Sequence, residues 1–523
     1  MKTCGLLPAV SFVAAVALSE ASGPEPKRAE PGIDLAQVPT WSDADLEFFL
    51  HGSMSTEVVP ERVLQAFLAT YPNLFPKKDL SNFGLIPDEK AGLPIGVSRR
   101  DVPHLGGLSS IGVNCASCHV GQIDFGAGKR PIKPLRVLGM TGQFDAEAFL
   151  GSVVVATFRT ADPANMKRYL ANYAAASEPK GGANTEEFKR QDEKIAAAVE
   201  ADPFGSKDVA PGALHKIGKL DVEPGTDLAV LARGQLKLFH NMRAALHVPD
   251  QPPQPSPPNG PGRNDPWRIL SYSLLGVVTK PAPIKFGIVW NADQRSWVHV
   301  DANTRSPIIR NLAASLGLGA PLLGRTGVLD FAAIERHTAL TEVIRPPRYP
   351  LTIDRAAAER GSKLYQANCA SCHDGPADDR RLHSIAEIKT DPNRAEIFTP
   401  EIAEQFNRFF AELQIPGYQP PEKPLRGTQK YWSPDLAGVW ARSPYLHNGS
   451  VRTMRELLTR PGERAKSFHR GARAYDASQM GYADEGAYIL DTTTPGNSNA
   501  GHDYGTGLSD AEKRELIEYL KTL

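Results

Sequence analysis

NCASCH stands at residues 114–119 and again at residues 368–373. Each copy places two thiols about one helical turn apart, with a histidine directly after the second cysteine. Two such thiols can add to the two vinyl groups of a haem, and the adjacent imidazole then binds the iron. The repeated hexapeptide therefore predicts two covalently bound haem c groups. The attachment and proximal residues are Cys115, Cys118 and His119 for the first haem, and Cys369, Cys372 and His373 for the second.

Other interpretations of paired cysteines explain this pattern less well. Disulfides are common in exported proteins, but a disulfide does not need a histidine after each pair. A zinc site would need further cysteines or histidines at comparable spacing. A thioredoxin-like redox site would not need the histidine twice. Haem attachment is the one interpretation that uses all six residues.

The composition is that of an ordinary globular protein. The 523 residues include 59 Lys plus Arg and 59 Asp plus Glu, so no net charge draws the chain to nucleic acid or to an anionic membrane. Glycine (45) and proline (44) exceed their average shares of about 7% and 5%, which predicts long irregular loops. The length suggests about three domains of usual size.

The N-terminus, MKTCGLLPAVSFVAAVALSEASG, predicts a secretory signal peptide over residues 1–21. Lys2 gives a short basic start, an apolar stretch follows, and small residues stand at the cleavage positions. An uncleaved anchor is the alternative, although the stretch is short for a bilayer span. Cys4 would leave with the signal. We therefore expect a periplasmic or secreted protein without a stable membrane span.

The remaining chain divides into two predicted haem domains, residues 22–344 and 345–523. An amphipathic helix runs into the second motif, and LSDAEKRELIEYLKTL closes the chain as a helix with Ser509 as its N-cap. A helical stretch also precedes the first motif. The charged segment 181–203 and the proline-rich segment 250–266 are predicted insertions. The expected fold is mainly α, with two cytochrome c-type haem domains, long irregular loops and insertions.

Three further stretches resemble a known family. SPDLAGVWARSPYLHNGSVRTMRELL (433–458) resembles the second-haem signature of the bacterial di-haem cytochrome c peroxidase superfamily, which includes the methylamine-utilisation di-haem enzyme. PGNSNAGHDYGTGLSDAEKRELIEYLKTL (495–523) and WVHVDANTRSPIIRNLAASLGLGA (297–320) are more similar to its rubber-oxygenase-like branch. The resemblance covers most of the chain after about residue 80. It implies that the C-terminal haem is a relay with two axial ligands, while peroxide or dioxygen reacts at the N-terminal haem.

The resemblance also suggests a sixth ligand for the relay haem. Peroxidases of the superfamily use a methionine fourteen residues beyond the PYxH histidine, and that position is Pro461 here. The branch resemblance points instead to His502, which would give a bis-histidine haem. His469, Met480 and His447 remain alternatives, and His447 is more simply a hydrogen-bonded residue in a turn. Arg442 and Lys430 are candidate partners of haem propionates, or else surface residues.

The N-terminal haem lacks a local distal histidine, because the next histidine after His119 is His215. The resemblance places the segment with Asp301, Asn303, Arg305 and Arg310 near this haem. An arginine and an amide beside reacting peroxide can stabilise charge. The alternative is that these residues hold haem propionates or structural turns. The predicted catalytic residues are Asn303, Arg305 and Arg310.

Two departures from the family pattern leave the activity open. Val300 replaces the usual electron-bridging tryptophan, although Trp290 and Trp297 are nearby, and no acid–base glutamate is evident. The first hypothesis is hydrogen peroxide reduction with a small redox protein as electron donor. The second is a dioxygen-dependent oxygenase of an apolar substrate, and the third is an electron-transfer cytochrome without catalysis. The family also commonly holds a calcium ion between its domains.

Overall fold

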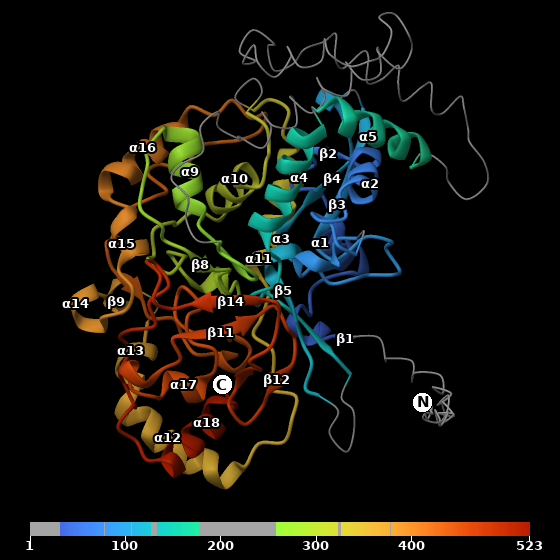
Figure 1. Ribbon diagram of the computed structural model, residues 1–523. Helices are drawn as coiled ribbons and strands as arrows, with labels where there is room; N and C mark the ends of the chain where they lie inside the picture. Colours follow the sequence, from blue (N-terminus) through green and yellow to red (C-terminus); the bar gives the residue numbers. More distant parts are fainter. Residues whose placement is uncertain are drawn as a thin grey trace, which may run out of the picture.

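The computed structural model describes most of the chain on both sides of one long internal gap (Figure 1). The predicted signal peptide (1–21), the predicted insertion 181–203 and residues 250–257 of the other insertion lie outside the described residues. Among the described residues, no helix is both long and apolar enough to cross a membrane. The described ranges are 32–77, 79–105, 107–126, 133–160, 162–176, 258–322, 326–376 and 378–523.

The first haem motif lies between two small sheets. Strand β4 leads into helix α3, which holds the motif, and β5 follows at once. The sheet orders are β2-β4-β3 before the motif and β1-β6-β5 after it. Helices α2, α4 and α5 pack beside the first sheet around a core that includes Phe67 and Tyr169 (Figure 1). The elements are β1 (Gly32–Ile33), α1 (Asp43–His51), β2 (Val59–Pro60), α2 (Glu61–Thr70), β3 (Val97–Val102), β4 (Leu108–Val113), α3 (Cys115–His119), β5 (Val120–Ile123), β6 (Leu135–Leu138), α4 (Ala146–Thr160) and α5 (Pro163–Ala175).

A second group of helices covers the middle of the chain. Helices α9, α10 and α16 bury apolar faces in a core built around Trp267, Phe398 and Phe406. Ser306 caps α10 by accepting the Ile309 N–H, and a proline follows each cap of α10 and α16. The elements are β7 (Arg263–Asn264), α9 (Pro266–Leu275), β8 (Ile284–Lys285), α10 (Pro307–Gly317), α11 (Phe331–Glu342), α14 (Ile385–Ile388), α15 (Asn393–Ile397) and α16 (Pro400–Ala411).

The second haem motif follows a helix that packs along the C-terminal helix. Helix α12 runs into α13, which holds the motif, and α12 lies against α18 (Figure 1). Ser509 caps α18 through a reciprocal capping box with Glu512, so the predicted cap is confirmed. The elements are α12 (Arg355–Asn368), α13 (Ala370–His373), β9 (Leu382–His383), β10 (Tyr431–Trp432), α17 (Met454–Leu457), β11 (Ser467–Arg470), β12 (Tyr475–Asp476), β13 (Gly481–Tyr482), β14 (Tyr488–Asp491) and α18 (Asp510–Leu520).

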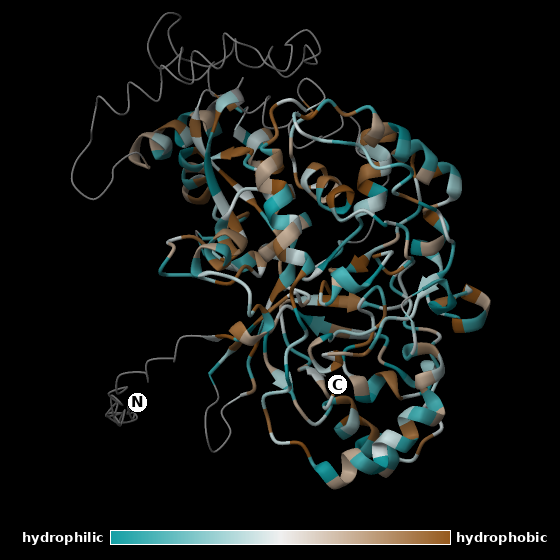
Figure 2. Cartoon of the chain, turned by 180° about the vertical axis from the view of Figure 1, so that it is seen from behind, coloured by the Kyte–Doolittle hydropathy of each residue, from teal (hydrophilic) through white to brown (hydrophobic). Residues whose placement is uncertain are grey.

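The fold is mixed rather than mainly α. In the described part of the chain, short strands pair into six sheets of two or three strands each. Some pair across long stretches of sequence, as β1 does with β6, and strands of two to four residues carry little alternating pattern. Hydrophobic stretches gather toward the middle of the molecule (Figure 2). One core joins Phe49 and Val120 to Leu516, and so crosses the predicted boundary at residue 344.

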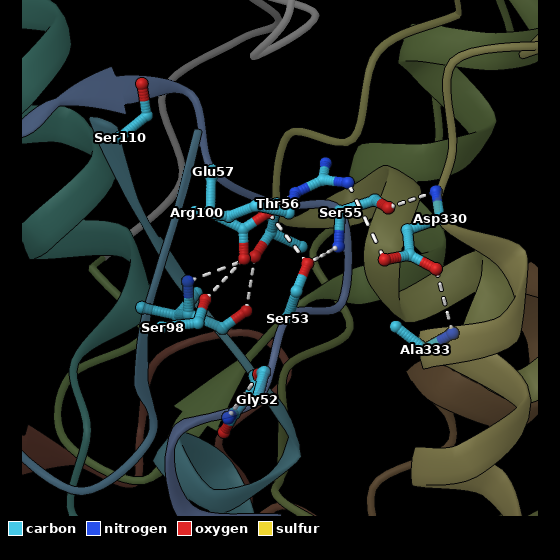
Figure 3. A network of polar contacts seen from close by, with 12 residues as sticks. Gly52, Ser53, Ser55, Thr56, Glu57, Ser98, Arg100, Ser110, Asp330 and Ala333 are labelled. Atoms are coloured by element: carbon cyan, nitrogen blue, oxygen red, sulfur yellow. Dashed lines mark hydrogen bonds and ion pairs between the residues drawn. The ribbon is translucent and has the colours of Figure 1, made fainter. Parts of the chain in front are cut away.

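The buried carboxylate of Glu57 is the centre of a polar network that connects segments on either side of the first motif (Figure 3). Glu57 accepts hydrogen bonds from the hydroxyls of Ser98 (2.5 Å) and Ser53 (2.9 Å), and its Oε2 lies 3.4 Å from Arg100 Nε. Asp330 caps α11 because its Oδ1 accepts the Ala333 N–H (3.1 Å), and its own backbone N–H donates to Ser55 Oγ (2.7 Å). This network ties residues 52–57 to β3 and to the start of α11.

The close contact of α12 with α18 gives a stability prediction. A Cβ on Gly361 would lie 2.0 Å from the Glu515 carbonyl oxygen, whereas a Cβ on Gly151, in α4, would meet nothing within 4 Å. Gly361→Ala should therefore lower the free energy of unfolding by about 1–3 kcal/mol. Gly151→Ala is the matched control and should raise it by about 0.5–1 kcal/mol. Urea titrations measure both changes, and equal effects of the two variants would contradict the helix packing.

Candidate haem centres

The second motif presents two free thiols and an oriented imidazole. Cys369 and Cys372 are not joined to each other. His373 Nδ1 lies 2.7 Å from the carbonyl oxygen of Pro434, which can only accept, so Nδ1 carries the proton. The Nε2 lone pair is then available to a metal. This is the arrangement that fixes the tautomer of a metal-binding histidine.

His502 lies opposite His373. The two ring centroids are 6.4 Å apart and the ring planes are inclined by 50°. Metal–nitrogen bonds of about 2 Å on each side, together with the depth of each ring, add up to about 6 Å. Burial lowers the pKa of His502 to about 4 and also lowers that of His373, so both imidazoles are neutral, as ligands must be. His502 Nδ1 is buried without a hydrogen-bond partner in the described part of the chain.

The cavity around these histidines suits a haem. It has a volume of about 300 Å³, and its apolar walls suit a planar hydrocarbon ring. Lys285, Arg295 and Arg442 also line it; Asp435 pairs with both arginines (2.9 and 3.4 Å), and the positive charge left over would suit the two propionates that a haem carries. Burial lowers the pKa of Lys285 to about 7, so an adjacent carboxylate would favour its protonated form. The residues therefore fit the cofactor. The apolar lining includes Leu436, Val439, Met454, Leu457, Leu458, Leu516 and Leu520.

The other candidates for this centre are placed differently. His447 lines the cavity, stacked on Tyr431 with ring centroids 4.3 Å apart, and its Nε2 lies 3.1 Å from the Tyr431 hydroxyl. His469 is exposed beside Asp484, and Met480 is fully buried; neither lines the cavity. Arg442 lines the cavity, whereas Lys430 is exposed.

The first motif is held in an apolar setting. Asn114 caps α3 at Ala116 N and donates through Nδ2 to the Gly52 carbonyl. Cys115 Sγ lies 3.2 Å from Met54 Sδ, and burial raises the pKa of the Cys115 thiol to about 11 and that of Cys118 to about 12. Neither thiol is in a disulfide. Both are therefore free for attachment to a haem.

One of the three predicted catalytic residues, Arg310, lies near His119, and a second, Asn303, contacts His299. Burial lowers the pKa of His119 to about 4, and the charge of Arg310 adds to that effect. Arg310 pairs with Glu342 at 3.0 Å. Asn303 is fully buried, and its Nδ2 has no hydrogen-bond partner among the described residues. Such an orphaned donor is available to a bound ligand.

Arg305 and Asp301 do not join this group. Arg305 is exposed and donates to the Glu422 carbonyl on the surface. Asp301 forms a buried ion pair with Arg394 at 2.9 Å. Because a carboxylate and a guanidinium neutralise each other there, neither side chain is left as an unpaired buried charge next to Asn303.

His299 is the main residue that sequence reasoning missed. Its Nδ1 lies 2.7 Å from Asn303 Oδ1, which also accepts from Thr304 Oγ1, so Nδ1 donates and Nε2 keeps its lone pair. His299 lines the cavity of the second motif, and burial lowers its pKa to about 3, with smaller contributions from the charges of Arg310 and His119. Its φ of +73° is uncommon for histidine. The sequence could have indicated His299, because it stands in the stretch 297–320 that resembles the family.

Trp290 lies between the two motifs. The fully buried indole donates through Nε1 to the Leu138 carbonyl and packs against Gly139, whose N–H donates to the His119 carbonyl. Its other edge packs against Gly438, in the loop that lines the second cavity. Trp297 lies instead beneath Arg426, with the guanidinium 3.8 Å from the ring centroid.

No calcium site is evident in the described residues. They contain no group of three or more His, Cys, Asp or Glu side chains arranged to hold a metal ion. The calcium ion expected from the family resemblance therefore has no such side-chain cluster to bind it in this part of the chain.

Comparisons with known proteins agree with a cytochrome. Residues 430–469 match the family described as RoxA-like, cytochrome c-like. A cytochrome c-like domain implies covalently bound haem c. The uncharacterized protein y4iJ of Sinorhizobium fredii is 25% identical to this chain, in an alignment that covers 92% of this chain and 92% of y4iJ. The uncharacterized protein y4iM of the same organism is 30% identical, in an alignment that covers 55% of this chain and 76% of y4iM. The cytochrome-c peroxidase IdrP1 of Denitromonas iodatirespirans is 28% identical over 20% of this chain and 30% of its own length.

The two sets of free thiols predict the number of haems. Intact-mass analysis of the denatured protein should find two covalent haems per chain, because thioether bonds survive unfolding. The double variant Cys369→Ala/Cys372→Ala should retain one haem, and so should Cys115→Ala/Cys118→Ala, its matched counterpart. If the wild-type protein carries only one haem, the variants show which motif holds it, and the assignment of the other motif is contradicted.

Proposed function

This chain belongs to the same protein family as y4iM, and on that premise we propose that it is an exported di-haem c-type cytochrome oxidoreductase. In this proposal the haem of Cys369, Cys372 and His373 relays electrons, and hydrogen peroxide is reduced near Cys115, Cys118 and His119. The observation that carries the proposal is the facing pair His373 and His502. The relative named cytochrome-c peroxidase supports the reaction class.

The relay role follows from the two imidazoles. A haem supplies one-electron chemistry when bound. His373 and His502 would together hold the haem, so that it would relay electrons and would not bind small molecules. Arg295, Arg442 and Lys285 neutralise propionate charge and hold the ring in place. Tyr504, 36% exposed, also lines this cavity, so the edge near Cys372 is where a small redox protein would deliver electrons.

The reactive role rests on polar groups near His119. Reduction of hydrogen peroxide to two waters consumes two electrons and two protons. The His299 Nε2 lone pair can accept a hydrogen bond, since Asn303 fixes the tautomer; burial lowers the pKa of His299 to about 3, so the imidazole is a weak base. The charge of Arg310 stabilises negative charge that develops on oxygen, and Glu342 orients Arg310. The Asn303 Nδ2 donor is free to hold a peroxide oxygen.

Electron transfer between the centres needs a short path through protein. Trp290 contacts elements next to both motifs and offers such a path in place of the tryptophan that Val300 replaces. The cation of Arg442 lies 5.6 Å from the Trp290 ring centroid. Trp290 thereby joins the wall of one cavity to the backbone of the other motif.

Two further functions have support from particular observations. The RoxA-like match favours dioxygen as an alternative reactant, with oxygenation of an apolar substrate. Val300, in the tryptophan position, favours an electron-transfer cytochrome without catalysis. The predicted signal peptide and the usual export of c-type cytochromes support a periplasmic or secreted location.

The proposed reactive site predicts a difference between two arginines. Arg310→Gln should lower the second-order rate of peroxide reduction by about 10²–10³-fold, because it removes a preorganised charge. Arg305→Gln should change the rate by less than about twofold, since exposed charges interact weakly. Stopped-flow mixing with peroxide and a dye donor measures both rates. Equal losses in the two variants would contradict the site, and no peroxide turnover in the wild type would contradict the function.

A further inference from the structure

The ligand His502 lies on an irregular loop. No helix or strand spans residues 492–509, and His502 itself has a φ of +46°. An axial ligand on such a loop must be fixed by other contacts if the iron is to remain six-coordinate. The His502 N–H donates to the Ile388 carbonyl at 2.9 Å, which fixes one point of the loop. A second, larger set of contacts comes from one side chain.

Arg464 is almost fully buried, with 5% of its surface exposed, and lies behind this loop. Its guanidinium donates to five backbone carbonyl oxygens, which is as many as its five N–H groups allow. Two of these carbonyls, those of Gly501 and His502, belong to the ligand and its neighbour. The bonds are Nε to Thr459 (3.1 Å), Nη1 to Asn499 (2.6 Å) and Gly501 (2.8 Å), and Nη2 to Leu457 (3.0 Å) and His502 (3.0 Å).

We propose that Arg464 is a positioning residue that holds His502 in place as the sixth ligand of the C-terminal haem. This inference rests on the proposed relay function. Leu457, another of its partners, lines the haem cavity, so the guanidinium fixes the loop to the cavity wall itself. A planar fork with five directed donors can hold two separate backbone segments, 457–459 and 499–502, which a lysine cannot do.

The charge of Arg464 has a second effect. Its side chain forms no ion pair within the described residues, and carbonyl dipoles surround it. A guanidinium stays protonated in proteins at neutral pH, so Arg464 carries a positive charge there. A buried positive charge next to an axial ligand favours the reduced haem, which carries one charge less than the oxidised form. Arg464 therefore raises the reduction potential of the relay.

Conservative and non-conservative substitutions separate these two effects. Arg464→Lys keeps the charge but not the fork, and Arg464→Met removes both. Arg455→Met is the matched control, because Arg455 lies nearby on α17 and pairs with Asp510, whose side chain is exposed. His502→Ala serves as the reference for a lost ligand. Low-temperature EPR gives the low-spin fraction, potentiometric titration gives the reduction potential, and cyanide binding reports an open axial position.

The expected results follow from the geometry. Arg464→Met should convert much of the low-spin signal of the C-terminal haem to high spin, accelerate cyanide binding about 10- to 100-fold and lower its reduction potential. Arg464→Lys should show part of the spin change with a smaller loss of potential. Arg455→Met should match the wild type. If Arg464→Met does not fold, as judged by circular dichroism, the Arg464→Lys result decides.

Two outcomes would overturn the proposal in different ways. If His502→Ala becomes high spin while Arg464→Lys and every folded Arg464→Met sample keep the wild-type spectrum and potential, Arg464 does not position the ligand, and the relay function stands. If His502→Ala stays low spin, the ligand assignment fails, and the inference about Arg464 fails with it.

Discussion

The separation between two imidazoles is the constraint on which the C-terminal half of this protein depends. His373 comes from a short helix and His502 from a loop more than a hundred residues later, yet their ring centroids lie 6.4 Å apart. The close packing of α12 against α18, the hydrogen bond from His373 to Pro434 and the five bonds of Arg464 all restrict that distance. In the relay that we propose, iron binding by both rings would require this preorganisation, because a loose ligand would leave an open position.

The two motifs share structural elements, although they lie far apart in the sequence. The segment that contains Gly287 contacts His119 and also lines the cavity of His373. Trp290 extends this contact to Gly438. One hydrophobic core includes residues from both predicted haem domains. The centres are therefore coupled through packed side chains, which suits electron transfer between them and the division of roles that we propose.

The sequence predicted local features better than contacts between distant segments. The paired motifs and the capping of α18 by Ser509 could be identified from short patterns, and the family resemblance pointed to His502 as a candidate ligand. The share of strand could not, because strands such as β11 and β14 have four residues each and pair only after the chain folds. The exposure of Arg305 and the contacts of Arg464 depend on backbone carbonyls from separate segments. No side-chain spacing reveals such contacts.

Low-temperature EPR of the fully oxidised wild-type protein tests the central claim most directly. A ferric haem held between His373 and His502 must be low spin, whereas a haem with an open position for peroxide is high spin. The account predicts one signal of each kind in equal amounts. A spectrum without a low-spin ferric signal would contradict the bis-histidine relay.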